Sequence, residues 1–373
     1  MSEVYVDYNG TAPASQAHFE ALMTIFKGEP LGNASSTHRC GRKMRLLREN
    51  ARDAICISLG GVDAENIFFT SGATEANNTV LAGLKKQGRL IYTAGEHASI
   101  VKPIQARHLR SQEPVDCIPL TPEGTVDTDK LLAKVDTETA LVSIMLVNNE
   151  TGCINPIKNI SEQIRKKNPT THIHIDAVQG WGKIPLGFIS QGCVDSLSLS
   201  GHKVGGLSGA GALYLKNPEQ ISSLILGGGH EHGFRAGTES MMSIVSMGLR
   251  AQDIEKNPKW LQHVIPIREK LANDLKNMGC KIWEGPNHTG NTIRVTCPNH
   301  PIEEVMLQLE MKKISASSGS ACSSGTPTPS STLLSMGATT WEASNSVRIS
   351  FGEGSLDEHG SQISQAFKEL LKP

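Results

Sequence analysis

Two short stretches of the chain each lead into side chains that can do chemistry. Residues 172–175 are followed by Asp176 and, three positions later, by Gln179. Residues 196–199 are followed, a few positions later, by Lys203. Both stretches have the pattern of short strands, and ligands of open α/β sheets bind at the carboxyl ends of strands. We therefore expect the carboxylate and the amine to meet at one edge of a sheet.

A carboxylate and a lysine at one edge are the two protein groups that pyridoxal phosphate requires, for its ring nitrogen and for a Schiff base. Lys203 lies in a glycine-rich, nearly uncharged stretch, where desolvation would favour imine formation. Gln179 could then reach the phenolic oxygen of the ring. Taken singly, each residue has an ordinary alternative, because a lysine after a strand is usually solvated and Asp176 could equally cap a helix.

Residues 71–74, Ser-Gly-Ala-Thr, lie between a predicted strand and a predicted helix. Free backbone N–H groups at a helix start bind phosphate, and a glycine there allows close approach. Ser200 and His202 would lie at the same edge and could complete an anion cradle. The alternative is an ordinary helix start in which Ser71 or Thr74 is the cap.

Three further residues are weaker candidates. His97 follows a predicted strand and could stack on a flat ring and move protons, although a lone histidine is more often structural. Arg348 lies within a predicted strand, where an inward-pointing guanidinium would suit a substrate carboxylate and an outward-pointing one would be solvated. Asn149 follows an apolar strand and could help to orient cofactor or substrate.

Cys322 lies in the segment 317–332, SSGSACSSGTPTPSST, which is nearly all Ser, Gly, Thr and Pro. This composition predicts a mobile, exposed loop rather than a core segment. An exposed thiol on such a loop is poised to act as a nucleophile. The other seven cysteines, for example Cys56 and Cys117, are expected to be small buried hydrophobes.

The elements that must position these residues follow an α/β pattern. Apolar periodicity predicts seven strands separated mostly by helices, at 67–70, 89–93, 115–120, 140–147, 172–175, 196–199 and 212–215. Such alternation implies a largely parallel sheet with right-handed crossovers. A smaller α+β unit follows, with strands near 281–283, 292–296, 314–317 and 346–351. We expect a large domain over 16–257 and a small domain made of 1–15 and 258–373.

Composition excludes several classes of protein. The chain has 373 residues, 20% of them charged, and a net charge of −1, which gives no electrostatic reason to bind nucleic acid or a membrane surface. The apolar runs are too short to cross a bilayer, and the first residues have no export signal. Eight cysteines without a Cys-x-x-Cys pair argue against a zinc site and a disulfide framework. A cytoplasmic protein with free thiols is expected.

A set of motifs, in the same order and over nearly the whole chain, resembles the cysteine desulfurases of the class-V aminotransferase family. The matching motifs are VDYNGTAP, GNASSTH, FTSGATEANN, EH, VNNETG, HIDAVQ, SLSGHK, GGGHEHGFRAGT, SSGSACSSG and VRIS. The resemblance implies the fold type I architecture of pyridoxal phosphate enzymes, with a large cofactor-binding domain and a smaller α+β domain that carries the Cys322 loop.

The resemblance also implies a role for each site residue. Lys203 forms the Schiff base with pyridoxal 5′-phosphate and removes the α-proton, and His97 stacks on the ring. The ring nitrogen and phenolic oxygen are held by Asp176 and Gln179. The phosphate is held by Ala73, Thr74, Ser200, His202 and, from the neighbouring subunit of a homodimer, Thr238. Cofactor and substrate carboxylate are oriented by Asn149 and Arg348, with Asn33 nearby.

The implied reaction takes the sulfur of L-cysteine as a persulfide on Cys322 and releases L-alanine. The persulfide would serve an acceptor protein, either a scaffold of iron–sulfur cluster biogenesis or a sulfur carrier. One alternative is a related lyase or transaminase that uses another amino acid, such as selenocysteine. A second alternative is a non-catalytic partner in sulfur relay that has kept only the fold.

Overall fold

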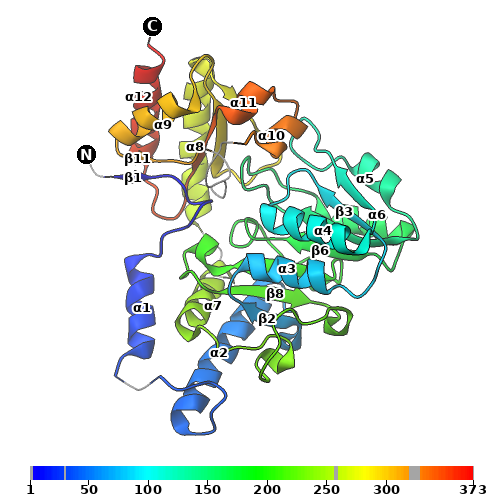
Figure 1. Ribbon diagram of the computed structural model, residues 1–373. Helices are drawn as coiled ribbons and strands as arrows, with labels where there is room; N and C mark the ends of the chain where they lie inside the picture. Colours follow the sequence, from blue (N-terminus) through cyan, green and yellow to red (C-terminus); the bar gives the residue numbers. More distant parts are fainter. Residues whose placement is uncertain (1–2, 29–30, 256–258, 319–327, 373) are drawn as a thin grey trace.

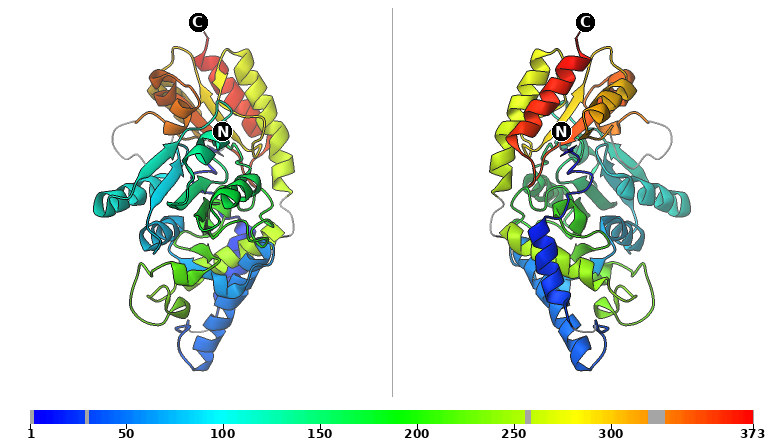
Figure 2. Two further views of the ribbon diagram at one scale, coloured as in Figure 1. Left: turned by 90° about the vertical axis from the view of Figure 1, so that its right-hand side faces the viewer. Right: turned by 90° about the vertical axis from the view of Figure 1, so that its left-hand side faces the viewer.

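The computed structural model describes residues 3–28, 31–255, 259–318 and 328–372. Its strands form a seven-stranded sheet, a three-stranded sheet and a two-stranded pair. In Figure 1 the large sheet and its helices fill the lower and right-hand parts, and the C-terminal elements gather at the top. Figure 2 shows the same separation from two sides, with the yellow to red C-terminal layer at one end and the blue α1 and α2 at the other.

The large sheet has the strand order β2-β8-β7-β6-β5-β3-β4. Its strands are β2 (Ile67–Thr70), β3 (Arg89–Thr93), β4 (Val115–Ile118), β5 (Thr139–Met145), β6 (His172–Asp176), β7 (Ser196–Ser200) and β8 (Gly211–Leu215). Neighbours from β4 to β7 are parallel, whereas β8 is antiparallel to both β7 and β2. The predicted seven-stranded, mostly parallel sheet is confirmed.

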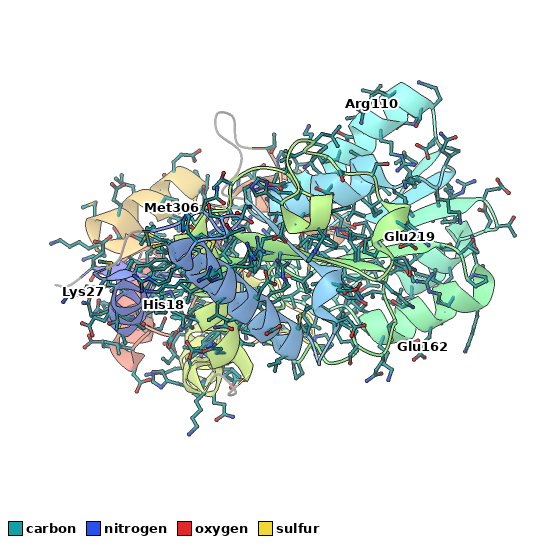
Figure 3. The ribbon with its side chains drawn as sticks, turned by 90° about the horizontal axis from the view of Figure 1, so that it is seen from below. His18, Lys27, Arg110, Glu162, Glu219 and Met306 are labelled. Atoms are coloured by element: carbon teal, nitrogen blue, oxygen red, sulfur yellow. The ribbon has the colours of Figure 1, made fainter. Side chains whose placement is uncertain are left out.

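Helices cover both faces of this sheet. One face packs against α3 (Ala73–Gly83) and α4 (Ala98–Ser111). The other packs against α2 (Arg39–Ser58), α5 (Thr128–Lys134), α6 (Ile157–Lys167) and α7 (Met241–Glu255). Figure 3 shows the two layers, with Arg110 of α4 and Glu162 of α6 on opposite sides of the sheet. Because both faces are covered, β5 is buried along its whole length, as is typical of parallel sheets.

The C-terminal elements have a core of their own. The small sheet has the order β12-β10-β9, with β9 (Lys281–Ile282), β10 (Thr292–Thr296) and β12 (Ser346–Ser350), and β1 (Val4–Tyr5) pairs with β11 (Ile314–Ser315). The helices in this part are α8 (Trp260–Asn277), α9 (Ile302–Met311), α10 (Ser331–Ser335), α11 (Thr340–Ser344) and α12 (Asp357–Leu370). Val4 and Val6 belong to this core, so the N-terminus lies among C-terminal elements.

The remaining α-helix, α1 (Gln16–Phe26), lies beside α7, and the chain descends to it from β1 in the view of Figure 1. The domain division at residue 257 stays a prediction, and residue 257 itself lies outside the described residues. No helix in the described parts of the chain combines the length and the apolar character needed to cross a bilayer.

Two expectations are wrong. The exposed loop predicted over 317–332 does not hold at its ends, because Ser317 pairs with the backbone of Arg348 and Thr332 is a buried residue of α10. Packing against the C-terminal layer outweighs the polar composition there. The other cysteines are not all buried, since Cys117 is exposed and Cys40 and Cys193 are half-buried. Cys117 lies on the outermost strand β4, which has only one neighbour in the sheet. Composition alone does not reveal which strand lies at an edge.

Candidate active site

A cavity of about 430 Å³ lies at the carboxyl ends of β6 and β7. The structure brings ten of the predicted site residues to its lining: Ala73, Thr74, His97, Asn149, Asp176, Gln179, Ser200, His202, Lys203 and Arg348. They come from both layers of the molecule, since all except Arg348 belong to the large sheet or its loops. The sheet edge that was expected to gather these side chains is therefore one wall of a cavity.

Lys203 lies in a short 3-10 turn, Gly201–Val204, that follows directly on β7. Its Nζ donates to the carbonyl oxygens of Asn9, at 2.8 Å, and Gly10, at 2.6 Å. The amine is thus held inside the cavity by the N-terminal segment rather than by solvent. A lysine held in this way has a fixed direction toward whatever occupies the cavity.

Asp176 ends β6 and is buried, at 4% exposure. Its Oδ1 accepts from the N–H of Val178 and its Oδ2 from Nδ2 of Asn77, at 3.1 Å each. The residues after it form turns, so Asp176 is not a helix N-cap. Burial raises the pKa of Asp176, whereas the charges of His97 and Lys203 and the two hydrogen bonds act in the opposite direction. A cation placed against this carboxylate would restore its usual ionisation.

A hydrogen-bonded chain behind Asp176 fixes its orientation. Asn77 receives a bond from the ring of His174, whose other nitrogen contacts Ser196 Oγ at 2.8 Å. Burial lowers the pKa of His174 to about 3, so the ring is neutral. Close by, burial and the charge of Asp176 raise the pKa of Glu96 well above its ordinary value. Of the two acids, Asp176 is the one that lines the cavity.

His97 is the N-cap of α4, where its Nδ1 accepts from the backbone N–H of Ser99. Burial lowers its pKa and the neighbouring Lys203 lowers it further, while Asp176 opposes this effect. A mainly neutral ring fixed by a cap can lie flat against a ligand without adding a charge. The structural and functional interpretations of His97 are compatible, because the cap uses only one ring nitrogen.

The N-terminus of α3 opens into the same cavity. The N-cap is Gly72, and no side chain in the described part of the chain caps the helix, so neither Ser71 nor Thr74 has the capping role of the alternative interpretation. The first N–H groups of a helix have no intrahelical partner and carry a partial positive charge. Burial and the neighbouring Lys203 lower the pKa of His202, which faces this end, to about 4. Backbone donors and a neutral imidazole suit a phosphate.

Arg348 points inward from β12 and is 2% exposed. Its Nη1 donates to the carbonyl oxygen of Asn149, at 3.1 Å, and its Nη2 to Oδ1 of Asp7, at 2.7 Å. Its Nε is buried and has no hydrogen-bond partner among the residues that the structure describes. A guanidinium with a buried unused donor at the wall of a cavity is suited to a carboxylate ligand.

Three predicted residues are not placed in this cavity. Thr238 and Asn33 are exposed and belong to loops that do not line it in the described part of the chain. Cys322 lies outside the described residues. An exposed Thr238 leaves room for the predicted contribution to a neighbouring subunit.

Sequence reasoning missed residues that hold the predicted ones. The carbonyls of Asn9 and Gly10 hold Lys203, Asn77 holds Asp176, and Lys183 donates to Gln179. Asn-Gly indicates only a turn, and an amide inside a helix gives no local signal of function. Their roles depend on contacts between distant parts of the chain.

The chain resembles known proteins over most of its length. The model of the class-V aminotransferase family matches residues 4–358. A cysteine desulfurase IscS of Dictyoglomus turgidum is 34% identical over 359 residues, which cover 94% of this chain and 90% of that protein. A solved NifS-like protein superposes with a TM-score of 0.91 at 30% identity, covering 99% of both chains. SspA, solved in complex with cysteine, superposes with a TM-score of 0.81 at 27% identity, covering 95% of this chain and 100% of that one.

Proposed function

Since the chain belongs to the class-V aminotransferase family, as one of its cysteine desulfurases, we propose that it uses pyridoxal 5′-phosphate to take sulfur from L-cysteine onto Cys322. The observation that carries the proposal is that Lys203 and Asp176 line one cavity together with the uncapped start of α3. An amine, a buried carboxylate and a set of phosphate donors are the three protein features that this cofactor needs.

The donor set fits the cofactor. Asp176 is a buried carboxylate whose pKa is raised mainly by burial, so a protonated ring nitrogen is a suitable partner. The start of α3, with Ser200 and His202, would hold the phosphate, and Gln179 would hold the phenolic oxygen. When bound, the cofactor supplies an aldehyde for the amino group of the substrate and a ring that withdraws electrons from its α-carbon.

The remaining steps belong to the side chains of this protein. Arg348 binds the α-carboxylate of L-cysteine, and Nζ of Lys203 accepts the α-proton and later returns a proton to carbon. The thiolate of Cys322 attacks the substrate sulfur; an S–S bond forms, the C–S bond breaks, and its electron pair stays with the carbon that becomes alanine. The role of Cys322 rests on its sequence context and on the family, because this residue lies outside the described part of the chain.

The proposal includes two kinds of partner. The exposed position of Thr238, away from the cavity of its own chain, supports a homodimer in which each subunit completes the phosphate site of the other. The persulfide then requires an acceptor protein, such as an iron–sulfur scaffold or a sulfur carrier, because the enzyme turns over only when Cys322 gives up its sulfur.

The test is incubation of the cofactor-loaded protein with L-cysteine, followed by intact-mass analysis and assay of alanine. We expect a yellow protein, alanine, and an added sulfur atom that maps to residues 317–332. Cys322→Ala should keep the colour and lose the adduct, and Lys203→Ala should lower alanine formation by about 10²–10⁴-fold, the range for a general acid–base group. A protein that binds no cofactor, or Lys203→Ala at the wild-type rate, would contradict the proposal.

A further inference from the structure

Lys183 is a second lysine beside Lys203 to which the proposed reaction gives no role. It lies in the turns that follow β6 and lines a second cavity of about 570 Å³ that Lys203 also borders. Burial, with a contribution from the charges of Lys203 and Arg348, lowers the pKa of Lys183 to about 7. Burial away from water disfavours the charged form of an amine, so we asked what the contacts of Lys183 contribute.

The first contact of Lys183 is with the side-chain amide of Gln179. Its Nζ lies 2.6 Å from Oε1 of Gln179. Both printed partners of Nζ are oxygens, so the amine is the donor in both contacts, whereas an amide has one accepting end and one donating end. This bond therefore keeps the oxygen of Gln179 on the side of Lys183. The NH2 end is left to face Asn9 and the cavity that Gln179 lines, and its Nε2 lies 2.9 Å from the Asn9 carbonyl oxygen.

The second contact of Lys183 is with the side chain of Asn9, whose Oδ1 lies 2.8 Å from Nζ. The backbone carbonyl of the same Asn9 accepts from Lys203. Asn9 thus stands between the two lysines. It is also bound to the small sheet, because its N–H donates to Ser350 Oγ and its Nδ2 to Thr292 Oγ1. One residue therefore joins Lys183, Lys203 and the C-terminal layer.

We propose that Lys183 is a positioning residue, which holds the NH2 end of Gln179 toward the cofactor and fixes Asn9 beneath Lys203. The inference rests on the proposed function, since Gln179 is taken to bind the phenolic oxygen of pyridoxal phosphate. An oxygen acceptor needs a donor opposite it, and a reversed amide would place two acceptors face to face. The effect of Lys183 on the cofactor must then pass largely through Gln179.

A double-mutant cycle tests this dependence. Apoproteins of wild type, Lys183→Met, Gln179→Leu and the double variant are titrated with pyridoxal phosphate, and the Kd and the visible absorption band are recorded. We expect each single variant to bind about ten- to a hundredfold more weakly, the worth of a hydrogen bond to a charged group, and the double variant to be no weaker than the weaker single one. Lys183→Met should also shift the absorption band, which a purely structural role would not do.

Lys86→Met is the matched control. Lys86 is likewise partly buried with a pKa lowered by burial, but its Nζ donates to Thr139 and Thr170, residues that do not line either cavity. Its variant should bind the cofactor like wild type. Lys183→Arg, which keeps a donor, should bind more tightly than Lys183→Met and serves as the test if the methionine variant does not fold, as judged by apoprotein melting.

The outcomes separate the inference from the proposed function. A wild-type protein that takes up no pyridoxal phosphate would contradict the proposed function itself. If wild type binds the cofactor, then equal affinity in Lys183→Met, losses that multiply in the double variant, or no gain in Lys183→Arg would each overturn the role of Lys183 alone.

Discussion

The large and small sheets differ in what packs against their faces. Each face of the large sheet packs against an apolar core, and helices cover both cores. On the small sheet, Ile293 and Ile349 face a core. Residues of the other face, such as Thr292, Arg294 and Arg348, are also buried but make polar contacts with Asn9, Glu150 and Asp7. The large sheet thus supplies stability and a row of strand ends, and the small sheet supplies a buried polar wall opposite them.

Buried arginines sharpen this contrast. Arg52, which packs onto the large sheet, uses all three nitrogens in bonds to Glu49, Glu231 and the Ile67 carbonyl. Arg294 is equally buried, at 1%, but within the described ranges its Nε and Nη1 have no hydrogen-bond partner. Unpaired buried guanidinium donors are costly, so the face of the small sheet that keeps them at Arg294 and Arg348 is built for something other than stability. The comparison predicts opposite consequences for mutations in the two regions.

The largest predicted change is a loss of stability in Arg52→Met. Removing one partner of a buried ion pair leaves the other charge uncompensated, so the free energy of unfolding should fall by about 3–5 kcal/mol. Burial alone would lower the pKa of Arg52, but the bonds and charge of Glu231 raise it, which indicates a strong pair. Urea unfolding of the apoprotein is the measurement. The replacement of the pair by Arg52→Met with Glu231→Met should recover part of the loss, and a stable single variant would contradict this interpretation.

The next largest predicted change is in substrate binding, when Arg348 of the polar wall is replaced. Arg348→Met removes the proposed partner of the substrate carboxylate, so KM for L-cysteine should rise about ten- to a hundredfold. The absorption of bound cofactor should hardly change, because Arg348 is not proposed to hold its ring or phosphate. Arg348→Lys keeps the charge but loses the fork and should be intermediate. A variant with normal KM but lost colour would move Arg348 from the substrate to the cofactor.

The strand ends of the large sheet and the polar wall of the small sheet also differ in how far the sequence predicts them. Asp176 and Lys203 could be placed together because each follows its own strand, and parallel strands end at one edge of the sheet. The direction of Arg348 could not be predicted, because it depends on Asp7, at the other end of the chain. Asn9 and Lys183 were missed for the same reason. The local sequence pattern determines where strands end, but the polar wall of the small sheet forms only when distant segments of the chain pack together.

A smaller effect concerns pH and the hydrogen-bonded chain behind Asp176. Burial lowers the pKa of His174 from 6.5 to about 3. Between these values the unfolded chain binds a proton that the folded protein does not, so this contribution to stability is lost as the pH falls below 6.5. At pH 5 the loss is about 2 kcal/mol.

His174→Gln should remove this part of the pH dependence. The difference in free energy of unfolding between pH 7 and pH 5 should be about 2 kcal/mol smaller in the variant than in wild type. His172, whose pKa is lowered to about 4 by burial, should continue to contribute its own share. An unchanged slope in His174→Gln would mean that another group takes up the proton.

The smallest effect is expected for Arg294→Met, although Arg294 is as buried as Arg52. Burial and the charge of Arg348 lower the pKa of Arg294, while Glu150, at 3.4 Å, raises it. The variant gives up this one long contact but also removes two unpaired donors, and Glu150 keeps its bond from Ser330. The loss of the contact with Glu150 and the gain from removing the unpaired donors nearly cancel, so the free energy of unfolding should change by less than about 1.5 kcal/mol in either direction. A loss as large as that of Arg52→Met would mean that the polar wall is held by its charges in the same way as the large sheet, and the proposed difference between the two regions would be wrong.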